Sequence, residues 1–123
     1  MSSRDERIDA FEARTRQFSI DVVALLESQR WSPVILKIVV QLAGSATSVA
    51  ANHRAVRRAR STREFAAKLQ VVNEEIDESV HWLETIQATG ACLAAARLSA
   101  TLSEGRELRS MFATARKTTR RLT

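Results

Sequence analysis

Apolar side chains recur every three or four residues through most of this chain, a spacing that places them on one face of an α-helix. The clearest series consists of Phe65, Leu69, Val72, Ile76, Val80 and Leu83. A second series, with a coiled-coil-like period, runs from Ile35 to Val56 and includes His53. Further series lie within residues 8–25 and 98–115. The pattern therefore predicts four amphipathic helices.

Capping residues mark where these helices begin and end. Capping boxes, in which a serine is followed three residues later by a glutamate, occur at Ser3 and at Ser61. Pro33, directly after a serine, is a further start signal because proline fits the first turn of a helix. Gly90 suits a left-handed C-terminal cap. We expect helices at about 4–27, 33–58, 62–88 and 93–120, with a frayed end over residues 117–123.

Short links between helices of this length favour an antiparallel up-down-up-down four-helix bundle. The chain has 123 residues, which is the size of one domain, and we place that domain at 1–123. Three glycines and one proline are present, and tyrosine is absent. Strand-rich folds and phosphate-loop folds need more turn residues and more aromatic residues than this. The sequence therefore predicts a single all-α domain.

The second predicted helix is too apolar to be covered by its own chain. Its apolar residues between Val34 and Ala43 point in all directions, and a helix that is apolar all round is buried all round. The third helix carries a second apolar row beside its main series. Such rows usually mark contacts between proteins, so we expect a homo-oligomer. The expected interface residues are Val34, Leu36, Val39, Val40, Val71, Trp82 and Ile86.

Charged residues are segregated along the chain, whose net charge is +5. Residues 54–68 carry six basic side chains and one acidic one, residues 69–92 carry five acidic ones and no basic one, and residues 97–123 carry seven basic and two acidic ones. Arginine dominates the basic segments, and its planar guanidinium suits two-point contacts with phosphate or carboxylate. The same groups are equally able to pair with acidic residues of a neighbouring subunit. The expected nucleic-acid contacts are Arg54, Arg57, Arg58, Arg60, Arg63, Lys68, Arg116, Lys117, Arg120 and Arg121.

Residues with catalytic or metal-binding chemistry are few and isolated. Glu78 and His81 have the Glu-x-x-His spacing of di-iron bundles, but a complete site needs this motif twice. The other histidine, His53, has no glutamate three residues before it and is expected inside the bundle. Cys92 is the single cysteine, which excludes an internal disulfide framework, and we expect it to pack. The sequence therefore predicts no metal, no cofactor and no enzymatic activity.

The sequence also bears on where the protein resides. A run of about 18 uncharged apolar residues is absent, which argues against a membrane-spanning segment. Residues 1–13 are polar and charged, unlike a secretory signal. We therefore expect a cytoplasmic protein.

Residues 41–86 resemble a known family. The stretches QLAGSATSVAAN (41–52), RARSTREFAAKL (58–69) and EEIDESVHWLE (74–84) are similar to the signature of the bacterial four-helix-bundle proteins encoded by intervening sequences in 23S rRNA genes. The resemblance implies a four-helix bundle, a ring-like homopentamer and no known catalytic activity. More distantly similar are the accessory proteins of diversity-generating retroelements, which bind a reverse transcriptase and RNA.

The chain departs from that family at two positions. Ala55 stands where the family usually has a glutamate three residues after the asparagine, so a polar network through that glutamate is absent here. His81 stands where the family has a tyrosine before the tryptophan. A function that depends on either side chain is expected to be altered in this chain.

Charge, fold and resemblance together predict a non-enzymatic binding module for RNA or a ribonucleoprotein. The arginine-rich patch would contact phosphate, and repeated copies around a ring would add avidity. The alternative is a protein–protein scaffold or adaptor that binds no nucleic acid and pairs its basic groups with acids across subunits. The expected partners are further copies of this chain, together with structured RNA or another protein.

Overall fold

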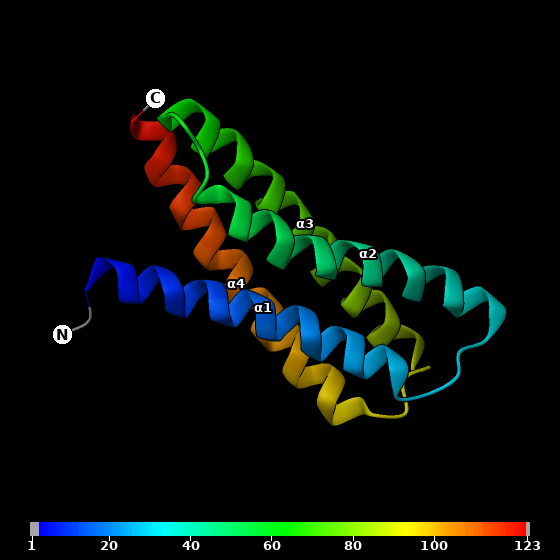
Figure 1. The fold of residues 1–123 in the computed structure, drawn as a ribbon. Coiled ribbons are helices and arrows are strands. Elements are labelled where there is room, and N and C mark those ends of the chain that lie inside the picture. The colour runs from blue at the N-terminus through cyan, green and yellow to red at the C-terminus, as the bar shows by residue number, and fades with distance from the viewer. Residues whose placement is uncertain (1–2, 123) are drawn as a thin grey trace.

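The computed structural model describes residues 3–122, and within that range the chain forms four α-helices and no strand (Figure 1). Helix α1 spans Arg4–Glu27, α2 spans Pro33–Val56, α3 spans Thr62–Thr89 and α4 spans Ala95–Leu122. The prediction of an all-helical fold with four helices is confirmed, and the arrangement is consistent with a four-helix bundle.

The helix ends are set by the capping residues that the sequence indicates. The Ser3 hydroxyl accepts the Glu6 N–H at 3.1 Å, and the Glu6 carboxylate accepts the Ser3 N–H at 3.4 Å, which completes a capping box at the start of α1. The hydroxyls of Ser32 and Ser61 cap α2 and α3 in the same position. Gly90 ends α3 with a left-handed φ of 69°, a conformation that costs glycine little.

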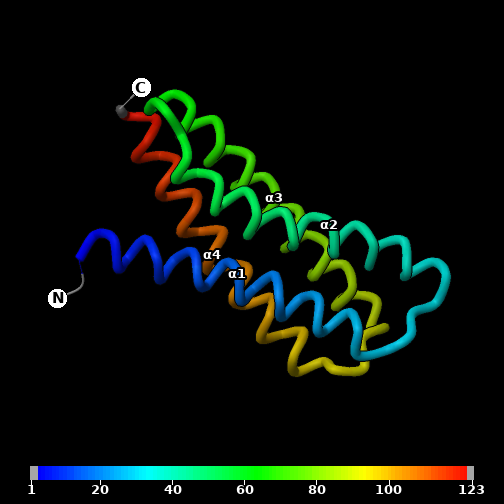
Figure 2. The backbone as a smooth tube through the Cα atoms, in the orientation of Figure 1, coloured from blue at the N-terminus to red at the C-terminus, as the bar shows by residue number. Residues whose placement is uncertain are grey.

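Each helix packs against the next one along the chain, and α1 also contacts α4 over a shorter stretch. The chain turns back in the links at residues 28–32, 57–61 and 90–94 (Figure 1). The N-terminal half of α1 diverges from the end of the molecule that holds the α2–α3 link and the C-terminus (Figure 2). This divergence leaves the side of α2 that faces the first half of α1 only partly covered.

All four helices contribute large apolar side chains to one core. Phe18, Leu42, Ile76 and Phe112 are each at most 1% exposed. Phe65, which the apolar series places in the core, is 38% exposed because it lies in the first turn of α3, beside the link. The rest of that series is buried.

Two of the predicted interface residues belong to this core, and for them the prediction is wrong. Val39 is 7% exposed and Ile86 is 1% exposed. Val39 precedes the buried Leu42 by three residues, and Ile86 follows the buried Leu83 by three, so helical periodicity turns both toward the interior. The continuous apolar run around Val39 did not show which of its positions face inward, and Ile86 belongs to the core and not to a separate outward row of its helix.

The predicted fraying of residues 117–123 is also not observed over the described part of that segment. Helix α4 continues to Leu122, and Thr119 is only 6% exposed. Its hydroxyl donates to the Ala115 carbonyl at 2.9 Å. Packing against the neighbouring helices therefore holds the last turns of α4, while Thr123 lies outside the described residues.

Helix α2 is long and apolar enough to cross a membrane by length and composition, although the sequence argued against a spanning segment. Only 28% of its most apolar stretch is buried within the molecule. Val34, Leu36 and Val40 are 73%, 46% and 61% exposed. An apolar face of α2 therefore remains uncovered by the described chain.

Two helical glycines provide a matched test of core packing. A Cβ at Gly44 would meet no atom within 4 Å, whereas a Cβ at Gly105 would lie 3.1 Å from the Phe18 ring and 3.3 Å from a Val80 methyl. Alanine at Gly44 is expected to raise the free energy of unfolding by about 1 kcal/mol through helix propensity. Alanine at Gly105 is instead expected to lower the free energy of unfolding, because its Cβ would press on the enclosed Phe18 ring, which must shift. Urea unfolding of both variants measures this, and equal stabilisation would contradict the close approach of α4 to α1 and α3.

Candidate nucleic-acid interface

The fold brings the two basic segments of the chain to the same end of the molecule. Arg106 pairs with Glu84 at 2.9 Å and Arg109 pairs with Asp77 at 3.3 Å, so residue numbers fall along α3 as they rise along α4. The last turns of α4 therefore lie beside the first turns of α3 (Figure 1). This end carries ten basic side chains of residues 54–68 and 116–121 against one acidic residue of those segments, Glu64.

Arg57, which was predicted as a phosphate contact, is already paired within the described chain. Its guanidinium lies 2.6 Å from the Asp9 carboxylate and 2.9 Å from the Glu12 carboxylate, both on α1. The hydrogen bond to Asp9 is the main reason that the pKa of Arg57 is raised. Arg57 therefore joins the end of α2 to the first half of α1.

Glu64 engages two more of the predicted contacts. Arg60 lies 3.4 Å and Lys68 lies 4.0 Å from its carboxylate, each at the i,i+4 spacing. Such solvent-exposed pairs are weak, so a phosphate competes with them readily. Arg60 in particular is 88% exposed at its side chain.

The remaining basic residues of this end differ in their surroundings. Arg116 is half-buried, with its Nε enclosed, and Arg120 has an intramolecular partner. Among the described residues, no hydrogen bond or ion pair forms through five exposed side chains, which are Arg54, Arg58, Arg63, Lys117 and Arg121. These five are the cations of the basic end that are free to meet a ligand.

A buried polar and aromatic cluster centred on His53 lies inside the molecule, next to the basic end. The His53 ring lies between Phe11 and Phe112, with centroids 4.5 and 4.9 Å away, and its Nδ1 lies 2.9 Å from the Thr15 hydroxyl. That hydroxyl donates its one proton to the Glu12 carbonyl, so Nδ1 of His53 is the donor to Thr15. Burial, followed by the charge of Arg57, lowers the pKa of His53 to about 4. His53 is therefore an interior residue, as expected, and is held in the neutral form.

The acidic segment on α3 is only partly paired within the chain. Asp77 and Glu84 pair with arginines of α4, whereas Glu75 lies near Glu74 and Glu78 and has its pKa raised, first by burial and then by those charges. No group of three or more metal-ligand side chains occurs between residues 3 and 122. The His81 ring instead contacts the Trp82 ring edge-on, at 4.7 Å.

Sequence reasoning did not identify the buried hydroxyls that accompany the core. Ser19 donates to the Ala46 carbonyl at 2.5 Å, and Ser79 donates to Ser45 at 3.1 Å. These contacts connect α1 with α2 and α2 with α3. The available signal was the position of Ser45 and Ser79 next to apolar core residues in their helices.

Comparison with known proteins does not add a family to this geometry. No family model, no curated protein and no solved structure matches the chain. The resemblance to the proteins encoded by 23S rRNA intervening sequences therefore stays a prediction from the quoted residues.

Proposed function

We propose that this protein is a non-enzymatic RNA- or ribonucleoprotein-binding module built on an antiparallel up-down-up-down four-helix bundle. Its basic end contacts the phosphate backbone, and several copies of the chain assemble so that these ends act together. The resemblance favours a ring of five. Aromatic side chains are scarce at this end, so binding depends on phosphate rather than on base stacking and weakens with salt.

The observation that supports this proposal is the convergence of cations for which the described residues provide no partner. Arg58 lies in the α2–α3 link, Arg63 lies in the first turn of α3, and Lys117 comes from the last turns of α4, which pack beside α3. A positive surface from three helices, whose nearby carboxylates already pair with Arg57, Arg60 and Lys68, has the character of a phosphate-binding patch. Arg57 is paired with Asp9 and Glu12, so the cations without a partner in the described chain are the stronger candidates for phosphate contact.

Assembly into a homo-oligomer is supported by the apolar residues left uncovered. Val34, Leu36 and Val40 on α2 and Val71 on α3 remain exposed, and Trp82 is half-buried. Burying apolar surface of this kind stabilises subunit contacts by about 25 cal/mol per Å². These five residues are the interface candidates that remain after Val39 and Ile86 are assigned to the core.

The test is the binding of a fluorescently labelled structured RNA, followed by anisotropy at about 50 and about 200 mM salt. Neutralisation of six or more phosphates predicts an affinity loss of about 10³-fold or more between these salt concentrations. The variant R58Q/R63Q/K117Q is expected to bind far more weakly at every salt concentration and to retain its size and helicity, because no side-chain partner is lost within the described chain.

The matched control is R30Q/K37Q/R97Q, which removes three exposed charges from the region of the α1–α2 link and the start of α4. It is expected to retain most of the binding. Equal losses in both variants would show that net charge alone attracts RNA, and no binding by the native protein at 50 mM salt would reject the proposal.

The second candidate function is a protein scaffold, which the unpaired acidic residues of α3 favour. Glu75 and Glu78 carry no ion pair within the described residues and are available to the basic end of another subunit. On that hypothesis the oligomer dissociates as salt rises, because its contacts are ionic. Light scattering across the same salt range distinguishes the two functions, because an oligomer held by an apolar interface keeps its size as the salt concentration rises.

A further inference from the structure

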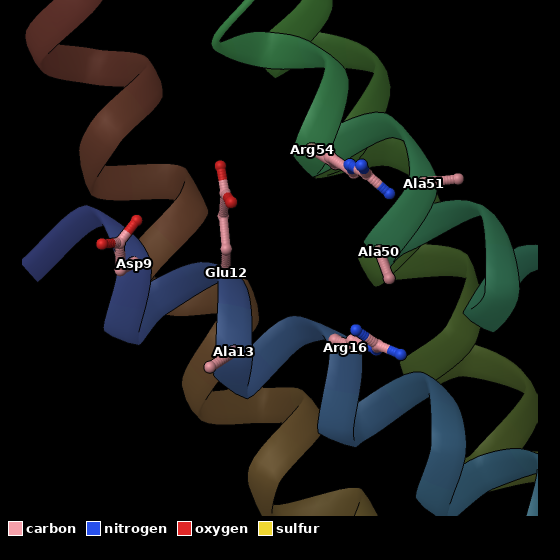
Figure 3. A pocket seen from close by; sticks show the side chains of 7 residues that line it. All are labelled: Asp9, Glu12, Ala13, Arg16, Ala50, Ala51 and Arg54. Carbon is pink, nitrogen blue, oxygen red and sulfur yellow. The ribbon is translucent and has the colours of Figure 1, made fainter.

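A groove of about 610 Å³ lies between α1 and α2, where α1 diverges from the rest of the molecule. Figure 3 shows Arg16 on the α1 side and Arg54 on the α2 side, with Ala50 between them. The lining residues are Asp9, Glu12, Ala13, Arg16, Ala50, Ala51 and Arg54. Three alanines leave the space that larger side chains would fill, so the groove is open between its two guanidinium groups.

Both carboxylates of the groove pair with an arginine that lies outside it. Asp9 and Glu12 both bind Arg57, at 2.6 and 2.9 Å, and Arg57 is not among the lining residues. One guanidinium offsets one of these two negative charges, so the four charged lining residues together with Arg57 carry a net charge of +1. Without Arg57, these two acids would be the natural partners of the arginines in the groove.

Arg16 and Arg54 have no partner among residues 3–122. Neither side chain makes a hydrogen bond or an ion pair with any residue in the described part of the chain, and both are exposed. Two guanidinium groups from opposite walls present planar donors to the same space. Such a pair suits an oxyanion that accepts several hydrogen bonds, which describes a phosphate group.

The groove is continuous with the basic end. Arg58 follows Arg54 by four residues, which is about one helical turn, and it is one of the cations of that end that have no partner in the described chain. An isolated anion would occupy the groove alone. A chain of phosphates is able to extend from the groove past Arg54 to Arg58, and this continuity favours a polymer.

The geometry points to the α1–α2 groove as a track for the phosphodiester backbone of RNA, with one phosphate on Arg16 and Arg54 and the following ones on the basic end. This inference rests on the proposed function and assigns it a site on α1, which the sequence did not indicate. Arg57 is the positioning residue, since it binds the two acids and leaves Arg16 and Arg54 free.

The experiment compares R16Q/R54Q with R30Q/R97Q in the same labelled-RNA titration, over a series of salt concentrations. Both variants lose two exposed charges, but only the first loses them in the groove. R16Q/R54Q is expected to bind roughly tenfold more weakly and to reduce the slope of log affinity against log salt by about 0.7–0.9, the value for one phosphate contact. R30Q/R97Q is expected to keep the native slope.

Three outcomes are distinguishable. A reduced slope for R16Q/R54Q alone supports the groove. Equal slopes for the two variants, with RNA bound by the native protein, overturn the groove and leave the basic end as the binding site. An absence of binding by the native protein overturns the proposed function and the groove together. Circular dichroism of each variant confirms that the helices are intact before the comparison is made.

Discussion

Acidification from pH 7 to pH 4 is expected to destabilise this protein by about 3 kcal/mol through His53 alone. Burial lowers the pKa of His53 from 6.5 to about 4, so the unfolded chain binds a proton in this range that the folded chain does not bind. The contribution of His53 to stability is therefore complete above pH 6.5 and is lost progressively as the pH falls toward 4. Urea unfolding at fixed protein concentration, repeated at half-unit intervals of pH, measures this slope.

The matched control is the second histidine of the chain. His53→Gln is expected to flatten the stability profile between pH 6.5 and pH 4, because a glutamine cannot take up the proton. His81→Gln, at an exposed position on α3, is expected to keep the native profile. Carboxylates titrate in all three proteins, so the difference between the two variants isolates His53. Parallel profiles for both variants would show that His53 is not buried in neutral form.

Replacement of Phe112 by alanine is expected to destabilise the protein by about 3–5 kcal/mol. Phe112 is fully buried on α4 and contacts Phe11 of α1 and His53 of α2, with ring centroids 4.7 and 4.9 Å away. The substitution leaves a cavity where three helices meet, and the surrounding rings cannot close it completely. Thermal unfolding is expected to shift downward by roughly 10 °C or more.

The same substitution is expected to alter the acid response. A cavity beside His53 admits water, which reduces the desolvation that lowers its pKa, so the pKa of His53 is expected to move back toward 6.5. The stability profile of Phe112→Ala would then be flatter between pH 6.5 and pH 4, and NMR titration of the His53 ring measures the shift directly. Phe65→Ala, which removes a partly exposed ring, is the control and is expected to leave the pKa of His53 unchanged. A small loss of stability in Phe112→Ala, similar to that of Phe65→Ala, would contradict the aromatic cluster.

The helices were predictable from the sequence because their signals are local. Apolar spacing, the serine caps and Gly90 act within a few residues, and the structure has helices where these signals place them. The interior position of His53 was predictable for the same reason, since it continues the apolar series of α2. Thr15, which is its hydrogen-bond partner, was not predictable because it comes from another helix, 38 residues away.

The sequence predicted which segments of the candidate site are basic, but not which of their arginines pair with acidic residues. The sequence by itself determined four helices, a strongly basic pair of segments and an excess of apolar surface on α2, because these properties depend on residue type and local spacing. Only the tertiary structure decided that Arg57 is bound by Asp9 and Glu12 while Arg16 and Arg54 find no partner in the described part of the chain. It also decided that Val39 and Ile86 face the core and that α1 diverges to open a groove. The physical reason is that pairing, burial and grooves depend on which helix faces meet, and that is settled by packing between residues far apart in the chain.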